Sequence, residues 1–162
     1  MNVFLVRHAH AVDETRTLSD EARHLSRDGR HAARELGRRL RWHDCAPTAI
    51  WTSPLVRAVM TAELVAGALE WDGPIESVRG LAPAGSTREV MAAIAAHDPS
   101  GAIVIVGHEP ALSGLGGALT GRADFPALQK AQAARIDGRV LRWLFAHDDE
   151  APVDPAQAGP TP

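Results

Sequence analysis

Two histidines stand directly after apolar runs that have the composition of buried strands. His8 follows the run 3–6 and the basic residue Arg7. His108 follows the run 102–106 and one glycine. An imidazole can act as a nucleophile or a hydrogen-bond donor, and an arginine binds anions. The carboxyl ends of parallel strands meet at one edge of an α/β sheet, where the active sites of such folds gather. Either histidine alone is compatible with a structural role, whereas two at equivalent strand ends predict a joint site.

Arg57 gives an independent reason to expect an anion. Ser53 and Pro54 predict a helix start, with a capping hydroxyl followed by proline at the first helical position. Arg57 then lies in the first turn, where the helix dipole and the free N–H groups disfavour a cation. An exposed arginine reaching into solvent would explain this position. Beside Arg7 and two histidines, an anion held between the guanidinium and the helix end is the better interpretation.

The remaining pattern predicts strands that alternate with helices. The expected strands are 3–6, 48–52, 75–78 and 102–106, followed by a hairpin of 133–136 and 140–145 around Asp137 and Gly138. The expected helices run from a Ser26 cap to about His43, from Ser53 to about Leu69, from a Thr87 cap to about His97, and onward from Pro110. This order predicts an α/β fold, a three-layer α/β/α sandwich with a mostly parallel central sheet and an antiparallel pair at its end.

Length and composition favour one domain in a reducing compartment. Residues 1–147 are expected to form a single domain, and the acidic, proline-rich stretch 148–162 a disordered tail. A formal net charge of -3 gives no reason to expect a nucleic acid or membrane partner. We see no signal peptide and no run near the roughly 20 apolar residues of a membrane span, so a cytoplasmic location is expected. The single Cys45 excludes an internal disulfide.

Four short motifs, in order along the chain, resemble those of the histidine phosphatase (phosphoglycerate mutase-like) superfamily. Residues 5–9 are similar to its Arg-His-Gly signature, and residues 23–29 to the stretch before its first long helix. Residues 53–62 are similar to the block with a second phosphate-binding arginine, and residues 106–110 to the block with the second histidine. Chain length and residues 81–85 resemble the small SixA-type branch, whose members dephosphorylate phosphohistidine on signalling phosphotransfer domains.

The resemblance implies a phosphoglycerate mutase-like fold and a hydrolase that carries a phosphoryl group on His8. Arg7 and Arg57 would clamp the phosphoryl oxygens, and His108 would add a donor. Two nearby arginines disfavour the imidazolium, so His8 is expected to be neutral near pH 7, with one ring nitrogen held by a backbone acceptor. Arg23 is a candidate for the rim of the pocket, although an ordinary surface position explains it equally well.

Two departures from the family pattern bear on the chemistry. Ala9 replaces the glycine of the signature, so the backbone there must suit an L-residue. Residues 81–87 hold no carboxylate, although many members place there the acid that protonates the leaving alcohol. Glu89 and His10 are the remaining candidates for that acid. Without one, substrates with good leaving groups are favoured, and phosphohistidine in a protein is expected over phosphoserine.

Other functions remain open at this point. A phosphatase for a small phosphate ester would use Glu89 or His10 as the acid, and a non-catalytic module would only bind phosphate. A mutase is less favoured, because the chain has little material for a lid that excludes water. A metal site at His8 and His10 is not expected because no carboxylate falls at ligand spacing, and no cofactor is expected.

Overall fold

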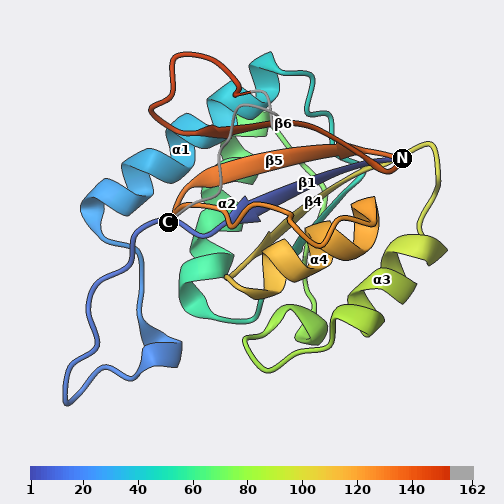
Figure 1. Ribbon diagram of the computed structural model, residues 1–162. Helices are drawn as coiled ribbons and strands as arrows, with labels where there is room; N and C mark the ends of the chain where they lie inside the picture. Colours follow the sequence, from blue (N-terminus) through green and yellow to red (C-terminus); the bar gives the residue numbers. More distant parts are fainter. Residues whose placement is uncertain (154–162) are drawn as a thin grey trace.

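A six-stranded sheet forms the centre of the structure, which is a computed structural model describing residues 1–153 (Figure 1). The strands are β1 (Asn2–Arg7), β2 (Ala49–Thr52), β3 (Ile75–Ser77), β4 (Ala102–Gly107), β5 (Gln132–Asp137) and β6 (Val140–Ala146). Their order is β3-β2-β4-β1-β5-β6, in which the first four are parallel and the last two antiparallel to their neighbours. The predicted α/β architecture is therefore confirmed, including the antiparallel pair at one edge.

Helices cover both faces of this sheet. They are α1 (Arg27–Trp42), α2 (Val56–Leu69), α3 (Thr87–Ala96) and α4 (Ala111–Thr120), with short 3₁₀ turns η1 (Asp20–Ala22) and η2 (Arg79–Leu81). Side chains alternate along β1. Phe4 and Val6 pack in one core cluster with apolar residues of α1 and α2. Val3 and Leu5 pack in the other with residues of α3 and α4. Because helices cover both faces of the sheet, β1 and β4 are continuous apolar runs, and the site lies at their carboxyl ends.

The start of α1 fixes the loop that follows β1. The Ser26 hydroxyl accepts a hydrogen bond from the Gly29 N–H at 3.0 Å, as the predicted cap requires. The Ser26 N–H in turn donates to the His10 carbonyl at 3.0 Å. A Cβ on Gly29 would lie 2.0 Å from that same carbonyl oxygen, so only glycine allows the helix to approach this closely.

Two predicted helix caps were wrong. Helix α2 begins at Val56 with Leu55 as its N-cap, because the Ser53 N–H still donates to the Val106 carbonyl and so continues the β2–β4 ladder. Helix α3 is capped by the Ser86 hydroxyl, which accepts from the third N–H of the helix, so Thr87 is the first helical residue. Arg57 nevertheless lies in the first turn of α2, so the argument about the helix dipole still applies.

The turn between β5 and β6 is also displaced by one residue from its predicted place. Asp137 pairs with Val140 in the ladder, so the turn residues are Gly138 and Arg139. Gly138 takes the positive φ, +61°, that the hairpin needs. The Asp137 carboxylate instead accepts from the Arg135 guanidinium at 2.8 Å, which holds Asp137 in the strand.

The first part of the predicted tail lies against the sheet. Val153 pairs with Leu144 of β6, and the Asp149 carboxylate accepts from the Ala146 N–H at 2.6 Å. The remainder of the predicted disordered tail, 154–162, lies outside the described residues. Within the described part of the chain, no helix has the length and apolar character needed to cross a membrane.

Candidate active site

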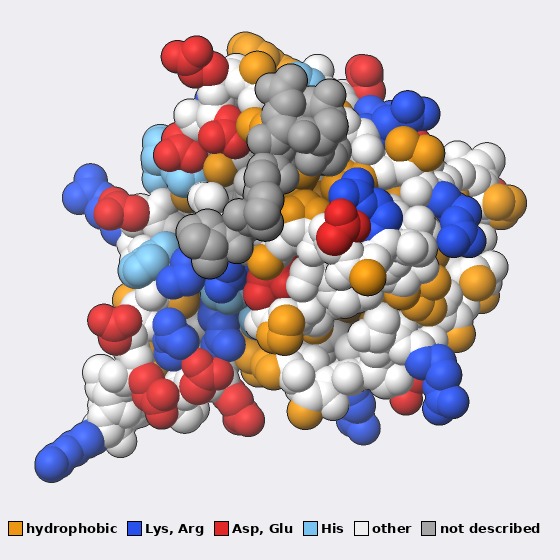
Figure 2. All heavy atoms as spheres, in the orientation of Figure 1, with side chains coloured by type: hydrophobic (Ala, Val, Ile, Leu, Met, Phe, Trp, Pro, Cys, Tyr) orange, Lys and Arg blue, Asp and Glu red, His pale blue; other side chains and the backbone are white. Residues whose placement is uncertain are grey.

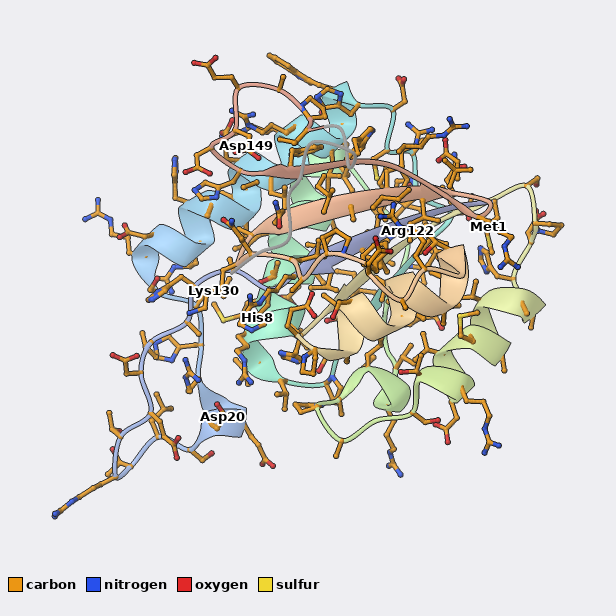
Figure 3. The ribbon with its side chains drawn as sticks, viewed as in Figure 1. Met1, His8, Asp20, Arg122, Lys130 and Asp149 are labelled. Atoms are coloured by element: carbon orange, nitrogen blue, oxygen red, sulfur yellow. The ribbon has the colours of Figure 1, made fainter. Side chains whose placement is uncertain are left out.

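Strand pairing brings His8 and His108 together. Arg7 lies opposite Gly107 in the β1–β4 register, and the His8 N–H donates to the Gly107 carbonyl at 3.1 Å. The two imidazole rings are buried with their centroids 4.9 Å apart, because they follow the carboxyl ends of neighbouring strands. His8 is labelled in Figure 3. The geometry confirms that the two histidines are brought together.

The tautomer of His8 follows from one short contact. Nδ1 of His8 lies 2.7 Å from the Ala9 carbonyl oxygen. A carbonyl oxygen can only accept, so Nδ1 carries the proton and Nε2 carries the lone pair. This is the backbone acceptor that the mechanism requires. Nε2 is the nitrogen that remains able to attack an electrophile.

Burial keeps this ring neutral. The pKa of His8 falls from 6.5 to about 4, mainly because burial disfavours the imidazolium, and the charges of Arg57, Arg7 and Lys130 lower it further. The bond to Ala9 acts in the opposite direction but is outweighed. Burial is therefore a larger cause of neutrality than the two arginines from which it is predicted by sequence.

Ala9 fits where the family signature has glycine. Ala9 is completely buried and is not among the residues with positive φ, so its methyl group imposes no backbone strain. The Ala9 N–H donates to the Thr61 hydroxyl at 3.1 Å, and that hydroxyl donates to the Arg57 carbonyl at 2.7 Å. Thr61 therefore joins the loop that holds the candidate nucleophile to helix α2.

His108 is positioned by Ser53, whose role the sequence did not reveal. Nε2 of His108 lies 2.8 Å from the Ser53 hydroxyl oxygen, which also accepts a longer bond, 3.4 Å, from the Leu55 N–H. If the hydroxyl proton goes to Nε2, the proton of His108 sits on Nδ1. That Nδ1 atom is buried and has no partner among the described residues, so it can donate to a bound anion. Burial is the main cause that lowers the pKa of His108 to about 3.

Arg7 presents a second buried donor. Its Nη1 donates to the Leu128 carbonyl at 2.7 Å, which fixes the direction of the guanidinium. Its Nε is buried and also lacks a partner among residues 1–153. Arg7 thus has one unpaired donor, and His108, whose ring centroid lies 4.9 Å from that of His8, has a second when its proton is on Nδ1. A buried donor without an acceptor is costly, and a bound oxyanion would remove that cost.

Arg57 and Arg23 meet at Asp20. The buried guanidinium of Arg57 donates to the Asp20 carbonyl at 2.7 Å and to its carboxylate at 3.2 Å. Arg23 donates to the same carboxylate at 2.9 Å, and its Nε donates to the Val12 carbonyl at 2.7 Å. The hydrogen bond from Arg23 is the largest cause that holds the pKa of Asp20 below its ordinary value. The site therefore holds an internal anion beside the two arginines, which the sequence did not predict.

The two candidate acids occupy different surroundings. Nδ1 of His10 lies 3.0 Å from the Ser26 hydroxyl at the start of α1. Glu89 is exposed in the first turn of α3.

A further carboxylate, Glu109, follows His108, but both of its oxygens accept hydrogen bonds from the protein. Its two oxygens accept from the N–H of Leu128 at 2.8 Å and from the hydroxyl of Ser113 at 2.7 Å. Among residues 1–153 no group of three His, Cys, Asp or Glu is arranged to hold a metal ion.

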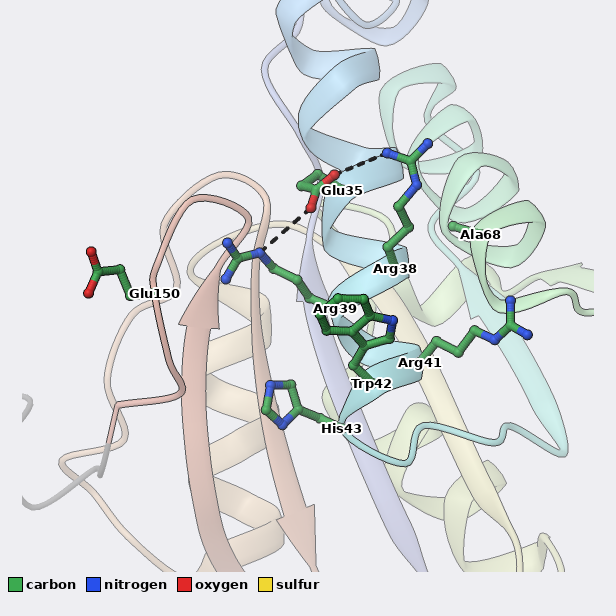
Figure 4. A pocket seen from close by; sticks show the side chains of 8 residues that line it. All are labelled: Glu35, Arg38, Arg39, Arg41, Trp42, His43, Ala68 and Glu150. Carbon is green, nitrogen blue, oxygen red and sulfur yellow. Dashed lines mark hydrogen bonds and ion pairs between the residues drawn. The ribbon is translucent and has the colours of Figure 1, made fainter.

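A separate surface pocket of about 260 Å³ at the end of α1 is not part of this site (Figure 4). Its guanidinium groups are largely paired. Arg38 donates to Glu35 at 3.0 Å, and Arg41 donates to Glu70, the residue after α2, at 2.5 Å. Cys45 is buried, and burial raises the pKa of its thiol to about 12, which disfavours the reactive thiolate.

The pKa of His8 gives a direct test of its environment. The ring C–H signals of His8 should keep the chemical shifts of a neutral imidazole from pH 8 down to about pH 5. They should move only as the pH approaches 4, because burial opposes protonation. An NMR titration in phosphate-free buffer measures this, with the signals assigned by their loss in His8→Asn. A titration midpoint near 6.5 would show that the ring is solvated.

The role of Asp20 is tested by charge removal. Asp20→Asn keeps the backbone carbonyl that binds Arg57 but removes a negative charge that repels a bound anion. Vanadate should then bind about fivefold more tightly, which is the magnitude of a partly exposed ion pair. Asp124→Asn is the matched control, because its carboxylate pairs with Arg122 at 3.0 Å on the surface. Weaker binding in Asp20→Asn alone would mean that the carboxylate holds Arg57 in place for the anion.

Known proteins show the same arrangement of elements. The chain is 33% identical over 114 residues to an uncharacterized protein from Picosynechococcus sp., a match that covers 69% of this chain and 68% of that protein. The structure of the protein histidine phosphatase SixA complexed with tungstate superimposes with a TM-score of 0.83 at 23% identity, covering 91% of this chain and 97% of that one. A mutant phosphoserine phosphatase from Entamoeba histolytica in complex with phosphoserine gives a TM-score of 0.70 at 15% identity, covering 91% and 98%.

The family model for the histidine phosphatase superfamily (branch 1) matches residues 3–83. This range includes the strand end with Arg7 and His8 and the first turn of α2 with Arg57. The model establishes the family, and the solved structures establish the fold. The chain belongs to the histidine phosphatase superfamily.

Proposed function

We propose that this protein is a phosphatase that transfers a phosphoryl group to Nε2 of His8 and then to water. The observation that carries the proposal is the contact between Nδ1 of His8 and the Ala9 carbonyl, which leaves the lone pair on Nε2. A low pKa keeps that lone pair available at neutral pH. Its preferred substrate is phosphohistidine in a signalling phosphotransfer protein.

In the first step, Nε2 of His8 attacks phosphorus opposite the leaving group. The bond from Nε2 to phosphorus forms while the bond to the leaving group breaks, and the leaving group takes a proton from solvent. Arg7, Arg57 and His108 donate to the three equatorial oxygens, where negative charge must be stabilised. The Nδ1 proton stays on the ring, and its bond to the Ala9 carbonyl stabilises the positive charge that develops there.

In the second step, water replaces the imidazole. Water attacks phosphorus, the bond between phosphorus and Nε2 breaks, and the proton of the water passes to solvent. His8 returns to its neutral form with Nδ1 still bonded to the Ala9 carbonyl. The same donors serve both steps because the phosphoryl group stays in place while the group opposite it changes.

The surroundings of the leaving group favour phosphohistidine. Residues 81–87 hold no carboxylate. His10 is engaged with Ser26, and Asp20, ionised between Arg57 and Arg23, has no proton to give. A phosphoryl transfer from one imidazole to another breaks and forms the same type of bond, so the leaving group needs little help. An alkoxide needs an acid that provides roughly 10²–10⁴ in rate.

The similarity to SixA supports this substrate class. The similarity to a phosphoserine phosphatase supports the alternative, a phosphatase for a small phosphate ester with Glu89 or His10 as its acid. A non-catalytic module that binds phosphate would need the arginines but not a neutral imidazole with a free Nε2. The fixed tautomer of His8 therefore favours an enzyme.

A series of leaving groups separates the two substrate classes. We expect kcat/KM to depend steeply on leaving-group pKa, because no side chain protonates the leaving atom. Phosphohistidine and aryl phosphates should be good substrates, whereas phosphoserine and simple sugar phosphates should be poor. Glu89→Gln and His10→Ala, measured with the same series, should leave the slope unchanged.

A shallow slope with good turnover of phosphoserine would contradict the preference for phosphohistidine. If one of the two variants then steepens the slope, that residue is the acid and the small-ester alternative holds. Tight binding of vanadate with no turnover of any member would identify a non-catalytic module.

A further inference from the structure

Lys130 is an exposed basic residue on a corner of the chain that is hydrogen-bonded to the end of β1. The chain reaches this corner after Leu128, whose carbonyl accepts from Arg7 at 2.7 Å and whose N–H donates to Glu109 at 2.8 Å. It leaves through Ala131, whose N–H donates to the His8 carbonyl at 3.3 Å. The corner is thus bonded to the residues that end β1 and begin the segment after β4.

The turn at Ala131 sets the position of Lys130. Ala131 has a φ of +54°, a conformation that few L-residues other than Asn and Asp adopt. Its carbonyl accepts from the His147 N–H at 3.1 Å, so both of its backbone polar groups are bonded. Ala131 is buried in a core cluster with Ala9 and Leu25. These contacts hold the backbone next to Lys130, while the lysine itself is exposed.

Lys130 lies near the nucleophile but outside the buried clamp. In the view of Figure 3, Lys130 lies close to His8, which follows the end of β1. The main cause of the low pKa of His8 is burial, and the charge of Lys130 lowers it further, after those of Arg57 and Arg7. Unlike Arg57 and Arg23, which pair with Asp20, Lys130 has no ion pair within residues 1–153. Its ammonium group is therefore available to a substrate.

Charged side chains of both signs lie near the nucleophile. Figure 3 shows Lys130 labelled close to His8, and Asp20 farther away on the projecting loop. Asp20 and Glu21 belong to η1, on the loop that projects beside the site. Figure 2 shows basic side chains gathered on this face, with acidic ones close to them. A substrate whose leaving group carries a negative charge is attracted toward the lysine, whereas the charge of Asp20 is balanced by Arg57 and Arg23.

We propose that Lys130 is a specificity-determining residue that binds an anionic group on the leaving group, outside the phosphoryl pocket. The inference rests on the proposed function, since it assumes that the phosphoryl group lies at His8. The substrate class it names is a phosphorylated molecule or protein segment with a carboxylate near the phosphoryl group. Lys130 is the only lysine in the chain, so substitution there removes the one ammonium side chain.

The test compares two substrates that differ by one charge, 4-carboxyphenyl phosphate and its neutral amide, 4-carbamoylphenyl phosphate. The ratio of their kcat/KM values should fall about fivefold in Lys130→Gln and be kept in Lys130→Arg, which retains the charge. High salt should lower the ratio in the wild type, because an exposed pair is screened. Arg122→Gln is the control, since that exposed cation pairs with Asp124 away from the site.

Calorimetric binding of the corresponding phosphonates measures the same ratio without turnover. A wild type that does not hydrolyse either phosphate but binds the carboxylated phosphonate more tightly, through Lys130, would overturn the proposed function and keep the role of the lysine. Equal losses for both substrates in Lys130→Gln would show that the amine acts on the phosphoryl group itself. That result, or an unchanged ratio, would overturn the inference.

Discussion

The short contact between Nδ1 of His8 and the Ala9 carbonyl decides which atom of the site can react. It exists because His8 continues the β1–β4 ladder, and because Ala9 is held in turn by the hydroxyl of Thr61. The same ladder places His108 beside His8, with Ser53 holding its Nε2. One hydrogen bond from the His8 ring to the backbone thus fixes the tautomer of His8, and the sheet fixes the position of the lone pair on Nε2.

Burial and charge act together on this ring. Burial lowers the pKa of His8 most, and the nearby cations lower it further, so the imidazole is neutral where we propose that a phosphoryl group binds. The cations remain available in different ways. Arg7 has an unpaired buried Nε, whereas Arg57 shares its guanidinium with Asp20. We propose that specificity depends on a group outside this clamp, the exposed cation Lys130.

The fold and the centre of the site could be predicted because their signals are local. Uninterrupted apolar runs gave the buried strands, and the helix dipole singled out Arg57. Other features depend on contacts between distant segments. Ser53 is a residue type that often caps helices. Only the pairing of β2 with β4 shows that its hydroxyl contacts His108 instead. Asp20 lies in a loop without periodicity. Lys130 is placed by a positive φ at Ala131, and alanine gives no indication of such a turn.

The central claim is that the phosphoryl group passes through Nε2 of His8, and the phosphorylated intermediate tests it most directly. Rapid acid-free quenching with labelled substrate, followed by alkaline digestion and comparison with both phosphohistidine isomers, identifies the nitrogen that carries the label. The account predicts alkali-stable label on Nε2, present in His10→Ala and absent in His8→Ala. Label on Nδ1, on another residue, or undiminished in His8→Ala would contradict it.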